Sequence, residues 1–336
     1  MKGSRVSLCY YPTTIILVDD QENYLDGLKM GLDDKLLCQY YTDPTKLVNF
    51  LKNYKPDPFI NRCVTFDEDS AQANLIVSQV SLRDIYSEIY NQNRFKQISL
   101  LVADYAMPGY NGLECCDAVR DKFIKKLLLT GEAQNDLAVK AFNERRIHQF
   151  IQKSTPNLMP VLNKAIEDLL LSYFLELSDY LRGAIEANIN QPMLTLLDDP
   201  VFAEFFYSIC EDKNIVEFYL LDNQGSFLLL NDKAEPTWLL MKDEIEMSSL
   251  TDFSEVEEAP EEIQMALRTR QKFPYFHTEE DTKTPPAEWE KYMHPATSLL
   301  GGQQTYYYCL LSGNLFGIDL NSITSLKEYL KNLEDE

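Results

Sequence analysis

The chain has few of the features that mark secreted, membrane or zinc-binding proteins. None of its apolar runs approaches the length that crosses a bilayer, and no apolar segment of a signal peptide follows Met1–Arg5. The seven cysteines form no Cys-x-x-Cys pair, and the three histidines are too few and too separate for a zinc site. We therefore predict no disulfide framework, and we expect a cytoplasmic protein with reduced thiols and no membrane partner.

Basic residues are also scarce, above all in the C-terminal part. The chain has 31 Lys and Arg against 53 Asp and Glu, a formal net charge of −22. Residues 191–336 hold 28 acidic and 10 basic side chains, or −18, and residues 1–190 hold 25 and 21, or −4. A region this acidic repels nucleic-acid phosphates, so direct DNA binding is disfavoured. The acidic run Asp243–Glu262 is typical of solvated surface, and contact with a basic partner is the alternative.

Polar side chains stand at the ends of four apolar runs. Thr14–Val18 and Ile98–Ala103 read as buried strands, and carboxylates follow each of them. Two further runs, Lys126–Leu129 and His148–Gln152, end in a hydroxyl and an ammonium group. In order along the chain, these four strand ends carry Asp19 and Asp20, then Asp104, then Thr130, then Lys153. Because open α/β sheets bind ligands at the carboxyl ends of their strands, we expect the three carboxylates to converge on one cation.

An acid pair, a lone acid, a hydroxyl and a lysine in this order resemble the receiver domain of two-component response regulators. The loop after Asp104 agrees, because Met107-Pro108 and Gly112 fit the tight turn that follows the third strand. Any one of these residues alone would be an ordinary polar residue at a loop end. The resemblance covers about Thr13 to Leu171, and it implies a flavodoxin-like, doubly wound α/β domain with a parallel five-stranded sheet.

The resemblance also implies the chemistry. Asp104 would accept a phosphoryl group from a sensor histidine kinase, with Thr130 and Lys153 binding the phosphoryl oxygens. Mg²⁺ would offset the charge of the reacting groups, and it prefers oxygen ligands. Its ligands would be three carboxylates and one backbone carbonyl: Asp19, Asp20, Asp104 and Ala106. Such a receiver catalyses only its own phosphorylation and dephosphorylation.

The sequence departs from the receiver pattern in three places. Ser154 follows the lysine where proline is usual, and the aromatic switch position holds Phe150, whose inward rotation could gain only burial. Asp20 and Asp104 lie 84 residues apart, about twice the usual separation, so we predict an insertion at about 56–97. Within it, Pro56–Ser70 reads as a surface excursion and Ser81–Gln97 as a helix that lies away from the phosphorylation pocket.

Beyond Lys153 the sequence predicts a connector and a second domain. We place the receiver at 1–155, an extended last receiver helix or connector at 156–190, and an acidic α+β output domain at 191–336. The connector pattern fits one helix that continues into a dimer seam, and it fits equally well two helices with a break. The output domain is predicted to contain a hairpin, two further strands and three helices: Val216–Leu221 with Ser226–Leu230, Thr237–Met241, Tyr306–Leu311, Pro200–Cys210, Glu257–Arg270 and Ser322–Leu333.

Three functions remain open for the whole chain. The first is a regulator that dimerises when Asp104 is phosphorylated and acts through an unidentified protein partner. Dimerisation would use Asn135–Arg146 and the helix after Pro156, with Arg145 and Arg146 pairing across the interface. The second is a DNA-binding output, which the acidic charge of the C-terminal part disfavours. The third is a nucleotide or small-molecule sensor or an unrecognised enzyme, and no sequence motif supports it. In its layout the chain resembles response regulators of α-hydroxyketone quorum-sensing circuits, which implies an upstream membrane histidine kinase.

Overall fold

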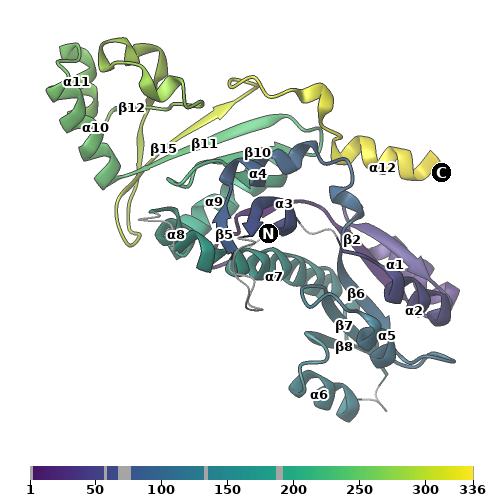
Figure 1. Ribbon diagram of the computed structural model, residues 1–336. Helices are drawn as coiled ribbons and strands as arrows, with labels where there is room; N and C mark the ends of the chain where they lie inside the picture. Colours follow the sequence, from purple (N-terminus) through teal and green to yellow (C-terminus); the bar gives the residue numbers. More distant parts are fainter. Residues whose placement is uncertain (1–2, 57–58, 67–76, 132–134, 187–191, 336) are drawn as a thin grey trace.

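Two β-sheets with their covering helices make up the protein, shown as a computed structural model in Figure 1. The structure describes residues 3–56, 59–66, 77–131, 135–186 and 192–335. Within those ranges, no helix is both long and apolar enough to cross a membrane.

The first sheet is parallel and has five strands, which confirms the predicted receiver fold. Its order is β3-β2-β6-β7-β8, formed by Leu37–Tyr41, Thr14–Val18, Ile98–Asp104, Lys125–Thr130 and Gln149–Gln152. Strands β2 and β6 are buried along their whole length because helices cover both faces of the sheet. Alternate residues of β2 pack on opposite faces, so Ile15 belongs to one hydrophobic cluster and Ile16 to another.

Helices cover both faces of this sheet, and capping residues mark where two of them begin. Helices α1 (Glu22–Gly31) and α7 (Leu158–Glu186) cover one face, and the other carries α2, α5 and α6, which span Pro44–Asn53, Gly112–Ala118 and Asn135–Asn143. Asp43 caps α2 by accepting hydrogen bonds from the backbone N–H groups of Thr45 and Lys46. Asn111 and Glu114 form a reciprocal capping box at the start of α5.

The second sheet is antiparallel and includes a strand from the N-terminus. Its order is β1-β9-β10-β11-β15-β14, formed by Cys9–Tyr10, Ile215–Leu220, Phe227–Asn231, Pro236–Asp243, Tyr306–Ser312 and Thr297–Leu299. The predicted hairpin and the two further strands are confirmed, and Gly225 adopts the positive φ of 91° that its turn requires. Sequence reasoning missed β1, in which Cys9 pairs with Tyr219.

Each of the three helices predicted for the output domain is present, but two further α-helices among the described residues, Pro192–Leu197 and Glu244–Val256, were missed. Helices α8, α9 and α12 span Pro192–Leu197, Pro200–Asp212 and Leu326–Asp335, and a small ribbon joins β12 (Lys272–Pro274) to β13 (Met293–Pro295). Helix α11 (Glu261–Arg268) lies within the predicted range Glu257–Arg270, and α10 (Glu244–Val256), which precedes that range, was not predicted. Glu258 takes a positive φ of 51° and Pro260 precedes α11, so the chain turns between them.

The insertion differs from its prediction because it packs into the core. It forms α3 (Ile60–Cys63), the short ribbon β4–β5 (Val64–Phe66 and Val77–Val80), and α4 (Leu82–Ser87) followed by two 3₁₀ turns. Part of the predicted surface excursion lies outside the described residues. In the rest of it, Phe59 and Cys63 are buried while Asn61 and Arg62 are exposed, so only one side of this part is surface. The predicted helix Ser81–Gln97 is α-helical over Leu82–Ser87 and continues as 3₁₀ turns at Glu88–Tyr90 and Arg94–Lys96.

A buried ion pair fastens the insertion to the second sheet. The Arg94 guanidinium donates to both carboxylate oxygens of Glu217 on β9, at 2.8 and 3.0 Å, and to the carbonyl of Thr324 at 2.6 Å. Tyr219 donates its hydroxyl proton to the same carboxylate at 2.6 Å. Both charged side chains are fully buried, so each depends on the other for compensation.

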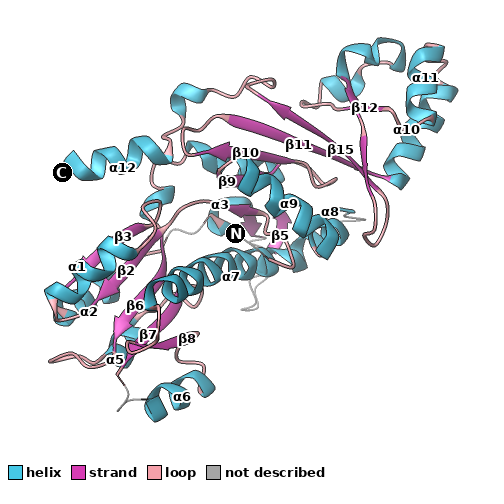
Figure 2. Ribbon diagram, turned by 180° about the vertical axis from the view of Figure 1, so that it is seen from behind, coloured by secondary structure: helices cyan, strands magenta, loops and turns pink. Residues whose placement is uncertain are grey.

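Helix α7 is continuous, so the alternative of two helices with a break is wrong. It runs through the middle of the molecule, between the two sheets, as Figure 2 shows. Phe174, Leu177 and Leu181 on its second half are buried, and the Phe174 ring lies 5.0 Å from that of Tyr10. These positions are therefore not available as a dimer seam in this conformation. One hydrophobic cluster extends through both sheets, and the boundaries proposed at 155 and 190 stay a prediction.

We predict that Glu217→Ala lowers the free energy of unfolding by about 3–5 kcal/mol, because it leaves the Arg94 guanidinium buried without a counter-charge. The double change Arg94→Met with Glu217→Leu should recover most of this loss, since no isolated charge remains. Denaturant unfolding measures both effects. Arg268→Ala, which removes an exposed pair with Glu255, serves as a control and should change stability little. A loss for Glu217→Ala as small as that of the control would contradict the assignment.

Candidate functional site

The carboxyl ends of β2, β6, β7 and β8 bring the predicted site residues together. Carboxylate oxygens of Asp19, Asp20 and Asp104 all lie within 4.8 Å of one another. Asp19 and Asp104 are buried, whereas Asp20 is exposed at the mouth of the site. Because β2 and β6 are neighbours in the parallel sheet, the two strand ends place their acids side by side.

Lys153 compensates this concentration of negative charge. Its ammonium nitrogen Nζ lies 2.6 Å from Oδ2 of Asp19 and 2.7 Å from Oδ1 of Asp104. Burial alone would lower the pKa of Lys153, but the hydrogen bonds and charges of Asp104 and Asp19 outweigh it and raise the pKa. The lysine therefore stays protonated and holds the two buried carboxylates together.

The backbone of Ala106 and Gly112 lies close against Asp104. Burial raises the pKa of this carboxyl, and Lys153 and the Ala106 backbone N–H, which donates to Oδ2 at 3.2 Å, partly offset the shift. A Cβ atom added at Gly112 would lie 2.3 Å from the Asp104 carbonyl oxygen, so only glycine fits there. The role of the Ala106 carbonyl as a metal ligand stays a prediction.

Thr130 presents an unused hydroxyl beside the acids. Its side chain is fully buried, and among the described residues its Oγ1 atom has no hydrogen-bond partner. A buried hydroxyl without a partner costs free energy, which a bound oxygen acceptor would recover. The Lys153 backbone N–H donates to the Thr130 carbonyl at 2.8 Å, which keeps the two residues adjacent.

Two aromatic side chains flank the site. Phe150 on β8 is half-buried, and its ring centroid lies 6.3 Å from that of Phe142 on α6. Tyr24 on α1 was missed by sequence reasoning, yet the Lys153 Nζ lies 4.2 Å from the centre of its ring. The only signal for Tyr24 was an aromatic residue in the first turn of the helix after the acid pair.

The donor set fits Mg²⁺. All three converging side chains offer oxygen atoms, which this ion prefers, and the exposed Asp20 leaves one side open to water and phosphate oxygens. The described residues contain no other such group of three acid, histidine or cysteine ligands.

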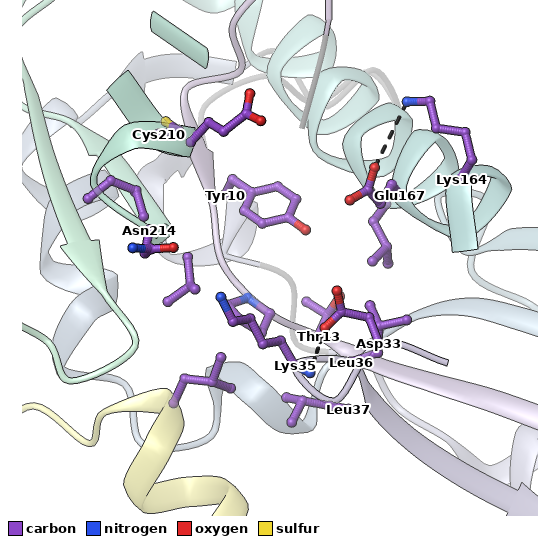
Figure 3. Close-up of a pocket in the computed structure, with 16 residues that line it drawn as sticks. Tyr10, Thr13, Asp33, Lys35, Leu36, Leu37, Lys164, Glu167, Cys210 and Asn214 are labelled. Atoms are coloured by element: carbon purple, nitrogen blue, oxygen red, sulfur yellow. Dashed lines mark hydrogen bonds and ion pairs between the residues drawn. The ribbon is translucent and has the colours of Figure 1, made fainter. Parts of the chain in front are cut away.

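A second candidate site is a cavity of about 540 Å³ at the opposite, amino-terminal edge of the parallel sheet (Figure 3). One side of the cavity is lined by residues of the segment 33–37 and by Lys164 of α7. The other side is lined by Val216 of β9 and by Asn214, which directly precedes this strand. Tyr10 is nine-tenths buried, and its hydroxyl points into the cavity. None of the acid cluster residues lines this cavity.

Among the solved structures similar to this chain is one that matches nearly its whole length. No protein-family model and no curated protein sequence matches the chain. The solved structure of the response regulator LqsR from Legionella pneumophila is 34% identical, covers 99% of this chain and 97% of its own, and has a TM-score of 0.82.

Two further solved structures match about half of the chain. An adenylate cyclase from Rhodopirellula baltica is 19% identical over 53% of this chain and 99% of its own, with a TM-score of 0.36. A response regulator receiver domain protein from Clostridium thermocellum is 16% identical over 47% and 94%, with a TM-score of 0.30. Neither TM-score is high enough to carry an argument. The identity to LqsR along nearly the full length of both chains shows that this chain belongs to the response regulators.

Proposed function

We propose that this response regulator is switched by phosphorylation of Asp104, with a sensor histidine kinase as the phosphoryl donor. The observation that carries the proposal is the pairing of three converging carboxylates with a protonated lysine and a buried, unpartnered hydroxyl. Asp104 would act as the nucleophile, and the other groups would bind the oxygens of the transferred group.

Phosphoryl transfer to Asp104 would use the side chains at this site as follows. A carboxylate oxygen of Asp104 attacks the phosphorus of a phosphohistidine, the P–N bond breaks, and the imidazole leaves with its electron pair. Mg²⁺ held by Asp19, Asp20 and Asp104 would neutralise charge between the acids and the phosphoryl oxygens. Lys153 then turns from the carboxylates to a phosphoryl oxygen, and Thr130 donates its proton to another.

The aromatic pair offers a path from the site to the surface. If Thr130 moves toward the phosphoryl group, the space beside it becomes available to the Phe150 ring, which now contacts Phe142. Phe142 is an exposed residue of α6, and Leu137 and Val139 on the same helix are also exposed. Val161 on α7 is exposed as well. Burying this apolar face in a homodimer would stabilise the phosphorylated conformation.

One detail of the predicted dimer interface needs revision. The Arg146 guanidinium pairs with Asp117 of the same chain at 2.5 Å, so it is not free to pair across a dimer in this conformation. Arg145 is exposed and forms no ion pair among the described residues, so it remains a candidate for that role.

The proposed output is contact with a protein. Phosphates would be repelled by the acidic C-terminal part, which carries −18 by the counts above, so DNA is disfavoured. The layout resembles regulators of α-hydroxyketone quorum sensing, and on that basis we place the chain in such a circuit, in the cytoplasm, below a membrane histidine kinase.

A ligand-sensing output is the second candidate, and the cavity in Figure 3 favours it. Its volume lies within the usual range for small-molecule sites. It joins elements of both sheets, so an occupant would affect how they are held together.

Asp104→Asn should abolish phosphorylation by radiolabelled acetyl phosphate, because the amide is not a nucleophile, and should leave the circular dichroism spectrum unchanged. Chelation of Mg²⁺ should have the same effect on the unaltered chain. Asp33→Asn, an acid at the other edge of the sheet, should label normally. Retained label in the Asp104→Asn chain would refute the assignment.

Lys153→Ala should still accept phosphate but fail to dimerise, because the lysine binds the phosphoryl group and couples it to the sheet edge. Gel filtration of the labelled protein separates the two effects. Lys283→Ala, an exposed lysine in the output part that pairs with Glu280, is the matched control. Wild-type dimerisation of phosphorylated Lys153→Ala would contradict the proposed switch.

A further inference from the structure

Helix α10 has a buried inner side and exposed apolar residues on the opposite side. Met247, Thr251 and Ser254 recur every three or four residues and are buried. On the other side, the exposed fractions are 67% for Ile245, 48% for Phe253 and 75% for Val256. Ile245 and Val256 lie eleven residues apart, about three helical turns, so they share one side of the helix. We call the set Ile245, Ser249, Phe253 and Val256 the α10 outer face.

Carboxylates surround the α10 outer face, and no lysine or arginine lies between positions 243 and 262. Some of these acids are already compensated, as in Glu244 with Arg270 at 2.6 Å and Glu255 with Arg268 at 2.8 Å. Others are exposed and form no ion pair with any residue that the structure describes: Asp252, Glu257, Glu258 and Glu262.

The fold does not depend on the two ends of the outer face. Asp243 caps α10 by accepting from the Glu246 backbone N–H at 2.7 Å, and the inner side of the helix packs on the protein. Helices α10 and α11 lie together at one end of the molecule, away from the parallel sheet, in both overall views (Figures 1 and 2). Ile245 and Val256 can therefore be changed without opening the core. Phe253 stacks on the buried Trp289, with 5.9 Å between the ring centroids, and is left in place.

The apolar residues and surrounding acids of the α10 outer face determine which class of partner it can bind. Exposed apolar side chains favour an apolar contact, but the surrounding acids repel nucleic acids, anionic lipids and the same surface of a second copy. They attract lysine and arginine. We propose that the α10 outer face binds a basic amphipathic helix of a partner protein, with an apolar stripe on Ile245, Phe253 and Val256 and flanking cations on the unpaired acids. This deepens the protein–protein output proposed above and rests on it.

The test uses two fluorescent peptides of about sixteen residues with identical lysine and leucine content. One has leucines at helical spacing, and the other has them scrambled so that no apolar stripe forms. Fluorescence anisotropy with the full chain should show that the amphipathic peptide binds at least tenfold more tightly, and amide hydrogen exchange should show protection at 244–256. Equal binding of the two peptides, or binding of neither, would overturn the proposal.

Matched variants locate the interaction. Ile245→Ser with Val256→Ser should weaken binding of the amphipathic peptide at least tenfold, which corresponds to about 1.4 kcal/mol. Met30→Ser with Leu315→Ser, at positions that are 89% and 55% exposed elsewhere on the surface, should leave it unchanged. Wild-type affinity in the Ile245/Val256 variant would overturn the proposal. If that variant does not fold, the peptide comparison on the unaltered chain still decides.

The experiment also separates this inference from the proposed function. The Ile245/Val256 variant should be phosphorylated at Asp104 as the unaltered chain is, since the site lies on the other sheet. If the unaltered chain is phosphorylated normally but binds the two peptides equally, the docking surface alone is refuted, whereas failure of the unaltered chain to be phosphorylated would refute the proposed function.

Discussion

The site depends on one constraint: the negative charge of three carboxylates that cluster at one edge of the parallel sheet must be neutralised. Their oxygens lie within 4.8 Å of one another, and two of the acids are buried. Such an arrangement is stable only with cations close by. Lys153 supplies one here, and Mg²⁺ with a phosphoryl group would redistribute the charge. A change in what neutralises Asp104 therefore has to move Lys153, which links chemistry to conformation.

The two sheets are held together by three separate parts of the chain. Strand β1 leaves the N-terminus to pair with β9, the insertion places Arg94 against Glu217, and α7 packs on both sheets. Strand β1 precedes Asp19 in the sequence and Arg94 precedes Asp104, so both ties lie far along the chain from the output strands that they contact. A rearrangement in the parallel sheet therefore acts on a shared core and not on a flexible linker.

Sequence reasoning predicted the parts of the fold that local pattern determines. Continuous apolar runs gave β2 and β6, and the Asp222–Gly225 turn gave the hairpin of β9 and β10. It failed where contacts between residues far apart in the sequence determine the structure. Strand β1 has only two residues and pairs with a strand about two hundred positions away. Arg94 and Glu217 are charged residues typical of surface, and only their pairing explains why both are buried. The site acids and lysine followed from strand order, whereas Tyr24 carried almost no signal because its role arises from the position of Lys153.

The most direct test of the central claim is the molar mass of the chain by light scattering after gel filtration, with Mg²⁺ and a fluoride that mimics the phosphoryl group. We expect the mass to double in the unaltered chain and to stay unchanged in Asp104→Asn. An unchanged mass in both proteins would contradict a phosphorylation-driven dimer. Doubling in both proteins would show that association does not depend on Asp104.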